Sequence, residues 1–334
     1  MLRKPFLHDR NGFFLYTHAM SNEMNKKMVP TVVRAKVLGY CMGVRRAMEG
    51  AHKAATNNSS GRVWTLGPLI HNKTALDMLA SEGVQILKDD DFTKIGGDDV
   101  VVIRAHGVTP TVKADVTARS KAVVDATCPR VMLSQKRVAD FAAKGYTVII
   151  AGDKNHGEVT GIAGCAQAAA TGNSRCILVG NKDDAQDYVT QIQDGREPLP
   201  EKAILICQTT ISRSEYDSIE NVLVPAISGL EVFDTICPAT TERQDALVDL
   251  QGQVDGVLII GGKHSANTQR LLTSALRYFD KAALIESADE IPAEFFQLER
   301  VGLSAGASTP DEVIDEVERR LQDGENISHE EIKL

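Results

Sequence analysis

The sequence has no long apolar run and no excess of positive charge. No apolar stretch approaches the ~20 residues that a membrane span needs, and the patch Phe13-Phe-Leu-Tyr16 is too short for the core of a signal peptide. The 37 Lys and Arg residues are outnumbered by 45 Asp and Glu residues, which gives a net charge of −8. We therefore expect a cytoplasmic protein that binds neither membranes nor nucleic acid and that holds any anionic ligand through local groups.

Several common binding motifs are also absent. There is no Gly-x-Gly-x-x-Gly after an apolar run and no Gly-x4-Gly-Lys-Ser/Thr, so nothing indicates a nicotinamide or ATP site. Any reducing electrons are therefore expected from another protein. The lack of a Cys-x2-Cys pair weakens zinc-ribbon and thioredoxin-like interpretations. The six cysteines have no regular close spacing, which favours free thiols over a disulfide framework.

Three of the cysteines stand where an apolar run gives way to a predicted helix start. Cys41, Cys128 and Cys237 lie roughly a third of the chain apart, and the last two share the pattern Asp-x-x-Cys-Pro. Thiolates from three separate units can meet only at a shared centre, and three soft ligands suit an iron-sulfur cluster with one iron left open. A structural thiol is the alternative at each position. The other cysteines lie in apolar segments and are interpreted as structural: Cys165, Cys176 and Cys207.

Short apolar runs alternate with amphipathic segments along the chain, which indicates parallel sheets covered by helices. Strands are expected at 100–103, 147–151, 177–179, 203–206, 256–260 and 282–285. Helices are expected at 45–55, 73–82, 131–144, 213–227, 242–253, 267–279 and 310–321. With 334 residues, the chain exceeds one usual core and fits three pseudo-related α/β domains. The predicted division is an N-terminal extension at 1–34, domains at 35–128, 129–236 and 237–322, and a C-terminal tail at 323–334.

Polar residues gather where the predicted strands end, which is the edge where parallel α/β units bind ligands. They comprise three histidines and three loops rich in hydroxyl and amide groups. The histidines are His71, His106 and His156, and the loops contain Thr209, Ser265 with Asn267, and Ser308. Such loops at helix N-termini make anion sites suited to phosphate, although simple helix capping is the alternative for each.

These residues resemble the 4-hydroxy-3-methylbut-2-enyl diphosphate reductase family, also called LytB/IspH. The resemblance covers about residues 36–322 and follows the family's order of motifs. The matching segments are Tyr40-Cys-Met-Gly-Val-Arg-Arg-Ala47, Ile70-His-Asn72, Ala105-His-Gly-Val108, Asp125-Ala-Thr-Cys-Pro129, His156-Gly-Glu158, Gln208-Thr-Thr210, Ile236-Cys-Pro-Ala-Thr-Thr-Glu-Arg-Gln244, Lys263-His-Ser-Ala-Asn267 and Ala305-Gly-Ala-Ser308. The resemblance implies a trefoil of three α/β domains with mostly parallel sheets around a central iron-sulfur cluster.

The resemblance also implies roles for individual residues. Cys41, Cys128 and Cys237 would hold one four-iron four-sulfur (4Fe-4S) cluster with an open iron. Glu158 matches the family's catalytic acid, and Thr209 matches the hydroxyl beside the substrate alcohol. His156 is expected to contribute to both catalysis and substrate binding. The implied substrate-binding set is His71, His106, His156, Thr209, Ser265, Asn267 and Ser308.

The implied reaction is reductive dehydroxylation of 4-hydroxy-3-methylbut-2-enyl diphosphate to isopentenyl and dimethylallyl diphosphate, the last step of the non-mevalonate isoprenoid pathway. Loss of an allylic hydroxyl requires a proton on the leaving oxygen, because hydroxide leaves poorly. The implied partners are the small isoprenoid diphosphate and an electron-donor protein of the ferredoxin or flavodoxin type. Two alternatives remain open, a closed zinc site made by the thiolates and a histidine, and a phosphate-binding module without redox activity.

Some positions depart from the family pattern. Family members often have Ser-Ser-Asn where this chain has Ser265-Ala266-Asn267, so one hydroxyl that could bind diphosphate is missing. The usual His-Pro-Glu is His156-Gly157-Glu158 here, and we expect the glycine to allow this loop more backbone freedom. Met42 replaces a commonly small residue, and the first 30 or so residues have no counterpart in the family.

Overall fold

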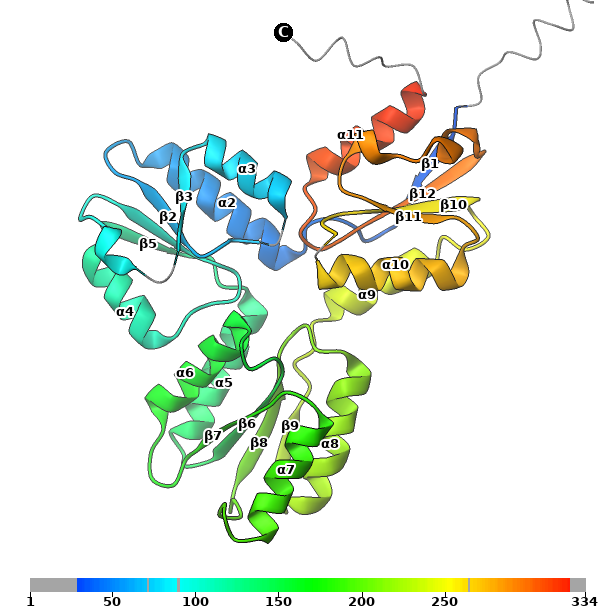
Figure 1. Cartoon of the computed structure of the whole chain (residues 1–334). Coiled ribbons are helices and arrows are strands. Elements are labelled where there is room, and N and C mark those ends of the chain that lie inside the picture. The colour runs from blue at the N-terminus through cyan, green and yellow to red at the C-terminus, as the bar shows by residue number, and fades with distance from the viewer. Residues whose placement is uncertain (1–28, 71, 89–90, 264, 325–334) are drawn as a thin grey trace, which may run out of the picture.

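The computed structural model describes residues 29–70, 72–88, 91–263 and 265–324 of the chain. Over these ranges the chain forms three four-stranded sheets, each with purely parallel pairing. Each sheet belongs to a separate lobe, and the lobes surround a common centre (Figure 1). The predicted fold class, three α/β units in a trefoil arrangement, is confirmed.

The first lobe contains the sheet with strand order β3-β2-β4-β5. Its strands are β2 (Val63–Leu66), β3 (Val84–Leu87), β4 (Val100–Ile103) and β5 (Ala122–Asp125). The surrounding helices are α2 (Met42–Asn57), α3 (Lys73–Ser81), α4 (Pro110–Arg119) and the short 3-10 helix η1 (Phe92–Lys94). Alternate residues of β4 pack on opposite faces, with Val102 in the cluster under α2 and α3 and Val101 in the cluster under α4. Burial on both faces explains why this strand reads as a continuous apolar run.

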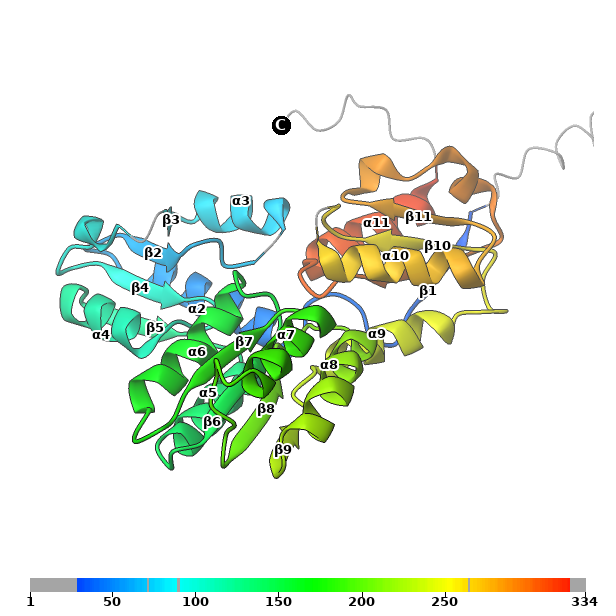
Figure 2. The ribbon, with the colours of Figure 1, turned by 60° about the horizontal axis from the view of Figure 1, so that its bottom comes forward.

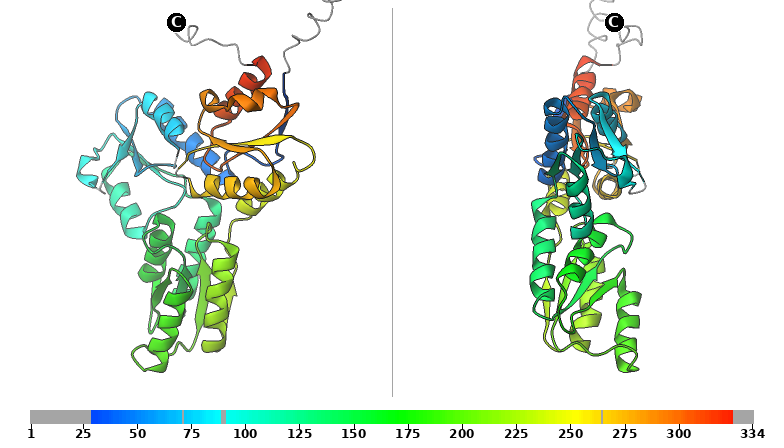
Figure 3. Two further views of the ribbon diagram at one scale, coloured as in Figure 1. Left: turned by 45° about the vertical axis from the view of Figure 1, so that its right-hand side comes forward. Right: turned by 90° about the vertical axis from the view of Figure 1, so that its left-hand side faces the viewer.

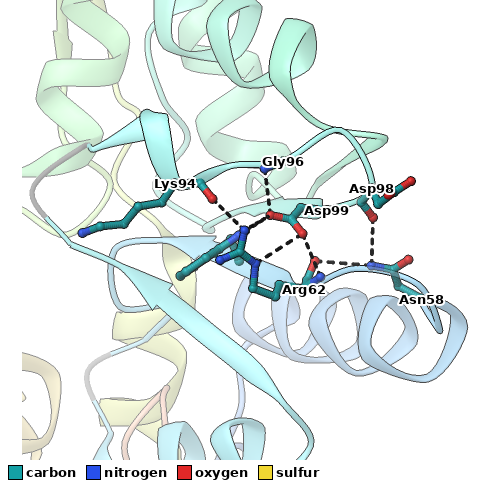
Figure 4. A network of polar contacts seen from close by, with 7 residues as sticks. Asn58, Arg62, Lys94, Gly96, Asp98 and Asp99 are labelled. Carbon is teal, nitrogen blue, oxygen red and sulfur yellow. Dashed lines mark hydrogen bonds and ion pairs between the residues drawn. The ribbon is translucent and has the colours of Figure 1, made fainter.

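The buried carboxylate of Asp99 connects the amino-terminal ends of β2 and β4 through hydrogen bonds (Figure 4). Asp99 is only 4% exposed and accepts hydrogen bonds from the backbone N–H groups of Arg62 and Gly96 at 2.8 and 2.9 Å and from Trp64 Nε1 at 2.9 Å. Arg62 Nη2 adds an ion pair at 3.1 Å. Burial by itself raises the pKa of Asp99, but the hydrogen bonds outweigh it and lower the pKa to about 2.

The second lobe contains the sheet with strand order β7-β6-β8-β9. Its strands are β6 (Thr147–Ala151), β7 (Cys176–Val179), β8 (Ala203–Cys207) and β9 (Leu230–Phe233). Helices α5 (Pro129–Ala142) and α6 (Gly157–Ala169) cover one face, and α7 (Lys182–Gln193) and α8 (Arg213–Ala226) cover the other. Every residue of β6 and β8 is buried, so these two strands form the centre of the lobe.

The third lobe contains the sheet with strand order β1-β12-β10-β11. Its strands are β1 (Thr31–Arg34), β10 (Gly256–Ile260), β11 (Ala282–Ile285) and β12 (Arg300–Ala305). Helices α9 (Pro238–Val248) and α10 (Ala266–Tyr278) cover one face, as Figure 2 shows for α10. The other face is covered by α11 (Asp311–Asp323) and the 3-10 helices η2 (Ala288–Glu290) and η3 (Ala293–Gln297).

Strand β1 differs from the sequence-based expectation. Residues 31–34 were expected in an N-terminal extension, yet Thr31 to Arg34 pair in parallel with Arg300 to Leu303 of β12. The strand is short and partly exposed, and it depends on a partner more than 260 positions away, as the register shows. Such a segment lacks a local signal, because its stability comes from a distant pairing. The structure therefore attaches these residues to the third lobe.

The division of the chain into domains otherwise stays our proposal, with boundaries at 35–128, 129–236 and 237–322. Residues 1–28 of the expected extension and 325–334 of the expected tail lie outside the described residues. Viewed edge-on the three lobes form a thin layer (Figure 3, right). Among the helices that the structure describes, none is both long enough and apolar enough to span a membrane.

Candidate active site

A pocket of about 1030 Å³, including its open mouth, lies where the three lobes meet. Its wall contains residues from all three lobes, most of them at the carboxyl ends of strands or in the first turns of helices. Many of the residues that the sequence singled out line it together: Cys41, His106, Cys128, Glu158, Thr209, Cys237, Ser265, Asn267 and Ser308. The parallel topology accounts for this convergence, because strand ends of the same polarity share one edge of each sheet.

Each of the three cysteines occupies the N-cap position of a helix that starts at the pocket. Cys41 precedes α2, Cys128 precedes α5 and Cys237 precedes α9. The sulfur of Cys41 accepts a hydrogen bond from the backbone N–H of Val44 at 3.5 Å. The partial positive charge of a helix N-terminus favours a thiolate over a thiol. Three helix starts therefore direct three potential thiolates to one place.

The repeated Asp-x-x-Cys-Pro pattern has a local structural cause. Asp125 Oδ1 accepts the backbone N–H of Thr127 at 3.0 Å, and Asp234 Oδ1 accepts that of Ile236 at 3.1 Å. These side chains form turns immediately before Cys128 and Cys237. The proline after each cysteine then occupies the first helical position, where a missing N–H costs nothing. The motif thus sets the direction of each sulfur.

The cysteine-bearing segments pack closely against one another. A Cβ atom at Gly43 would lie 2.8 Å from the sulfur of Cys128, so only glycine allows this approach of α2. Burial raises the pKa of the Cys237 thiol, and negative charge on Cys41 and Cys128 raises it further, while Arg130 lowers it. Thiolates gathered in this way would repel one another, so a positively charged partner would stabilise them.

The donor set around the pocket fits a metal-sulfur cluster. All three thiols are free and half-buried, and they belong to three different helix starts on one cavity wall. Within the described ranges, no three His, Cys, Asp or Glu side chains converge closely enough to coordinate a single metal ion. Ligands of a multi-iron cluster each bind a different iron and need not approach a common point, so the wider spacing is compatible with a cluster.

Glu158 and Thr209 form the second chemical feature of the pocket. Glu158 lies in the first turn of α6 and is 1% exposed. Its Oε1 accepts the backbone N–H of Thr209 at 2.7 Å, and its Oε2 accepts the Thr209 hydroxyl at 2.8 Å. Burial raises the pKa of Glu158, and the two hydrogen bonds from Thr209 only partly counteract this effect. The pair joins α6 to the end of β8.

Two histidines lie beside this carboxyl group. His156 caps α6, and its Nδ1 accepts the backbone N–H of Glu158 at 3.2 Å. Its ring meets that of His106 edge-to-face, with centroids 4.9 Å apart. His106 lines the pocket, and His156 contacts it without being one of the lining residues. His156 therefore orients the start of α6 as well as standing next to the pocket.

The third lobe contributes hydroxyl and amide groups. Ser265 caps α10 and accepts the backbone N–H of Thr268 at 3.4 Å, and Asn267 follows in the first turn. Ser308 lies beyond the end of β12 on the same wall. A helix N-terminus with short polar side chains makes a local anion site, which an acidic protein needs for a phosphate ligand. Two positions of interest, His71 and the side chain of Ala266, lie outside the described residues.

Gly157 packs against an arginine that the sequence interpretation overlooked. A Cβ atom at Gly157 would lie 2.5 Å from Nη2 of Arg104, whose side chain also passes 2.9 Å from the position of a Cβ at Gly67. The glycine therefore makes room for a side chain that reaches from the end of β4 to the start of α6. From the sequence we expected Gly157 to allow more backbone freedom. The structure shows in addition that Gly157 packs closely against Arg104.

Another overlooked residue is Arg243, on the face of α9 that lines the pocket with Thr240 and Gln244. Its side chain is 4% exposed. In the sequence these residues appear only as part of the matching segment that ends at Gln244. The available signal was the helical spacing, because Arg243 and Gln244 follow Thr240 by three and four positions and such residues lie on one face of a helix.

Fold and site together define a class of protein, namely a three-lobed α/β protein whose central pocket gathers three thiols and a buried carboxyl group. The LytB protein family matches residues 32–322. This match covers most of the chain, and the chain belongs to the LytB family.

Named relatives agree with this assignment. The 4-hydroxy-3-methylbut-2-enyl diphosphate reductase of Treponema denticola is 46% identical over 300 residues, which cover 88% of this chain and 99% of the relative. The reductase of the same name from Geobacter sulfurreducens is 38% identical over 299 residues, covering 88% and 98%.

Solved structures show the same similarity. A structure of (E)-4-hydroxy-3-methyl-but-2-enyl diphosphate reductase, the terminal enzyme of the non-mevalonate pathway, superposes with a TM-score of 0.73 at 33% identity and covers 89% of this chain and all of the other. The corresponding reductase from Plasmodium falciparum gives a TM-score of 0.68 at 25% identity, with 86% of each chain covered.

Proposed function

We propose that this protein is an iron-sulfur oxidoreductase that converts 4-hydroxy-3-methylbut-2-enyl diphosphate to isopentenyl diphosphate and dimethylallyl diphosphate by reductive dehydroxylation. Membership of the reductase family supports the reaction class. The observation that carries the proposal is the single pocket in which three thiols from different helix starts face the Glu158–Thr209 pair. Sulfur ligands and a proton donor on one cavity wall are the two elements that a reductive loss of hydroxide needs.

Cys41, Cys128 and Cys237 would hold a 4Fe-4S cluster with one iron open. Their free thiols, their helix N-terminal positions and their separation across one cavity support this ligand set. When bound, the cluster would supply electrons one at a time and a Lewis-acidic iron. Gly43 contributes by leaving space beside the sulfur of Cys128.

Glu158 would act as the proton donor and Thr209 as the relay to the leaving oxygen. Burial keeps the carboxyl group in its protonated form at a higher pH than an exposed glutamate, because it raises the pKa. The backbone N–H of Thr209 donates to Oε1, so the proton of the acid form would lie on Oε2. That proton would then be donated to Thr209 Oγ1, which reverses the hydroxyl-to-Oε2 hydrogen bond and frees the hydroxyl proton for the leaving oxygen. His156 would fix this geometry by capping α6 at the backbone N–H of Glu158.

The diphosphate would lie among His106, Ser265, Asn267 and Ser308, together with His71 and the nearby His156. The positions of Ser265 and Asn267 at the start of α10 support this placement, because helix N-termini favour anions. With a net charge of −8, the protein must attract the diphosphate through such local groups.

The two reducing electrons would come from a small electron-donor protein of the ferredoxin or flavodoxin type. We place the protein in the cytoplasm, where its six free thiols would stay reduced.

Anaerobic purification followed by turnover tests the proposal. The expected product is a brown protein with broad visible absorption and roughly stoichiometric iron and sulfide. With a chemical reductant it should convert the hydroxylated diphosphate to both isoprenoid diphosphates.

The two alternatives predict different outcomes. A colourless protein with stoichiometric zinc would support the closed zinc site. Binding of isoprenoid diphosphates by a metal-free protein, with no turnover after anaerobic reconstitution with iron and sulfide, would support the binding module. Either result would overturn the reductase.

A further inference from the structure

Arg243 forms a buried bridge between two of the cysteine-bearing segments. From α9, its Nη1 donates to the carbonyl oxygen of Ala239 at 2.8 Å, and its Nη2 donates to that of Gly39 at 2.6 Å. Ala239 lies two positions after Cys237, and Gly39 lies two positions before Cys41. A single guanidinium group thus joins the backbone near two of the sulfurs.

The surroundings of Arg243 leave its charge without a carboxylate at hydrogen-bonding distance in the described structure. Its hydrogen-bond partners there are the two carbonyl groups, and its buried Nε has no acceptor. Burial lowers the pKa of Arg243, while negative charge on Cys41, Cys237 and Glu242 raises it. A buried cation is costly unless an opposite charge compensates it. Of the negative groups that act on this cation, Cys41 and Cys237 line the same pocket as Arg243.

We infer that Arg243 is a positioning residue whose buried charge stabilises the negative sulfur centre held by Cys41 and Cys237. This inference rests on the proposed function, because it takes that centre to be the iron-sulfur cluster. Nearby positive charge and hydrogen bonds to sulfur both stabilise the reduced, more negative state of a cluster. Arg243 therefore raises the reduction potential and makes the cluster a better acceptor of electrons.

The chain offers a matched control in Arg46. This residue lies on α2 and donates to the carbonyl groups of Asp125 and Thr127 at 3.2 and 3.3 Å, beside Cys128. It makes the same kind of contact with a cysteine-bearing segment, but its side chain is exposed. Water screens an exposed charge far more strongly than a buried one. Replacement of Arg46 should therefore leave the cluster potential almost unchanged.

The test compares wild type with Arg243→Met, Arg243→Lys and Arg46→Met after anaerobic reconstitution. Iron and sulfide content, the midpoint potential from an optical redox titration, and the melting temperature of the iron-free protein are measured for each. Arg243→Met should shift the potential to more negative values and lower the melting temperature. Arg243→Lys keeps the charge but loses the forked donor geometry, so its potential should stay near wild type while its melting temperature falls.

The potential separates this role from a purely structural one. A wild-type potential in Arg243→Met, with only a lower melting temperature, would overturn the inference and leave Arg243 as a structural bridge. If Arg243→Met does not fold or does not bind iron, Arg243→Gln decides, because it removes the charge but keeps a polar side chain: a more negative potential than in Arg243→Lys supports the inference, and equal potentials in the two variants overturn it. Absence of iron and sulfide from the wild type would instead contradict the proposed function itself.

Discussion

The carboxyl group of Glu158 is buried, and both of its oxygens form hydrogen bonds with Thr209. Its pKa is raised by that burial. A backbone N–H cannot accept a proton, whereas a hydroxyl group can both accept and donate one. Under the proposed function, a proton from Glu158 would therefore move through the Thr209 hydroxyl toward the pocket.

Replacement of Glu158 by glutamine should abolish most turnover without loss of the cluster. Glutamine has nearly the same shape and can still accept the Thr209 N–H, but it has no acidic proton. We expect kcat to fall by roughly 10²–10⁴-fold, the usual contribution of a positioned general acid. Iron content, the visible spectrum and single-turnover kinetics check this outcome.

Glu215→Gln serves as the control, because Glu215 also lies in the first turn of a helix but is exposed on α8. This variant should keep full activity. Wild-type kcat in Glu158→Gln would remove Glu158 from the mechanism.

The acid form of Glu158 predominates below its raised pKa, so wild-type activity should also decline as pH rises through that value.

Gly43→Ala should reduce the iron content of the protein. Its new methyl group would stand 2.8 Å from the sulfur and 3.0 Å from the Cβ of Cys128. Both atoms are close to the backbone, so they cannot move away as the end of a long side chain could. Because α2 would have to shift, the geometry of the thiols would change, and we expect partial or complete loss of iron and sulfide after reconstitution.

Gly50→Ala is the matched control on the same helix. A methyl group there would lie 3.3 Å from Val124 Cγ1, a contact that a small side-chain adjustment relieves. Alanine also favours a helix by up to about 1 kcal/mol over glycine. This variant should bind iron like the wild type. Equal iron content in both variants would show that the space beside Cys128 is not required.

At the residue level, the sequence predicted the proposed catalytic residues better than the buried arginines that pack around the pocket. Glu158 and Thr209 were proposed from motifs, and the structure places them in contact. Arg104 and Arg243 were not singled out, because an arginine in a sequence does not reveal whether its charge will be buried. Burial depends on the meeting of lobes that are far apart in the chain.

At the level of secondary structure, helix starts position the thiols. Cysteine is not a preferred N-cap residue, since serine, threonine, aspartate and asparagine satisfy the first N–H groups better. Cys128 makes no side-chain capping bond, yet α5 begins directly after it. Helix stability therefore does not explain a sulfur at this position, which agrees with the proposed role of Cys128 as a ligand.

Cys128→Ser should lose the cluster while keeping the fold. Serine is a good N-cap residue, so α5 should be as stable as before or more stable, but a hydroxyl group is a poor ligand for iron in a cluster. We expect a colourless or strongly depleted protein with an unchanged melting temperature of the iron-free form. Iron and sulfide analysis and circular dichroism measure the two effects separately.

Cys165→Ser provides the comparison, because Cys165 is a half-buried thiol within α6 and does not line the pocket. Iron content should be unaffected there. Full iron content in Cys128→Ser would mean that the proposed ligand set is wrong.

The Asp99 network should make the stability of the first lobe depend on acidity. The pKa of Asp99 falls from 3.8 to about 2 on folding, which corresponds to roughly 2.5 kcal/mol at about 1.4 kcal/mol per pKa unit. Since the folded pKa is lowered, this stabilisation is present above the unfolded pKa and is lost as pH falls from 3.8 toward 2. Asp99→Asn should therefore lower stability by a similar amount near pH 7 and by little near pH 2.

Urea unfolding of the iron-free protein at several pH values measures this difference. Asp98→Asn is the neighbouring control, since the hydrogen bond in Figure 4 uses the backbone carbonyl of Asp98 rather than its carboxylate. A pH-independent loss of stability in Asp99→Asn would contradict the electrostatic explanation.

The predictability of secondary structure followed the strength of local signals. The fully buried strands β6, β8 and β10 coincide with predicted apolar runs. Strand β2 is also fully buried but was not predicted, because Thr65 interrupts its short apolar run. Strand β1 is short and partly exposed and was assigned to an extension, because its pairing with β12 depends on residues near the other end of the chain. Local composition cannot reveal such a partner.

For the whole molecule, the separate cores of the lobes explain how a pocket can form between them. Each lobe has apolar clusters on both faces of its own sheet, so none needs the centre for its core. The spacing of the cysteines predicted three units, but the way the lobes meet came from the family resemblance. Contacts between lobes, such as Arg270 of α10 with the carbonyl oxygen of Thr210 after β8, involve single polar groups that leave no pattern in the sequence.

Removal of the cluster should therefore loosen the centre of the molecule while leaving the lobes intact. We expect faster amide hydrogen exchange in the first turns of α2, α5 and α9, which begin at the three thiols, because like-charged sulfurs would no longer be held by a common cation. The buried strands at the lobe centres should stay protected, and so should α7, which packs against β7 and α8 within the second lobe. Hydrogen-exchange mass spectrometry of reconstituted and iron-free protein, both kept anaerobic, measures the difference. Equal exchange at the three helix starts, or faster exchange spread evenly over α7 and the central strands, would mean that the cluster does not connect the lobes.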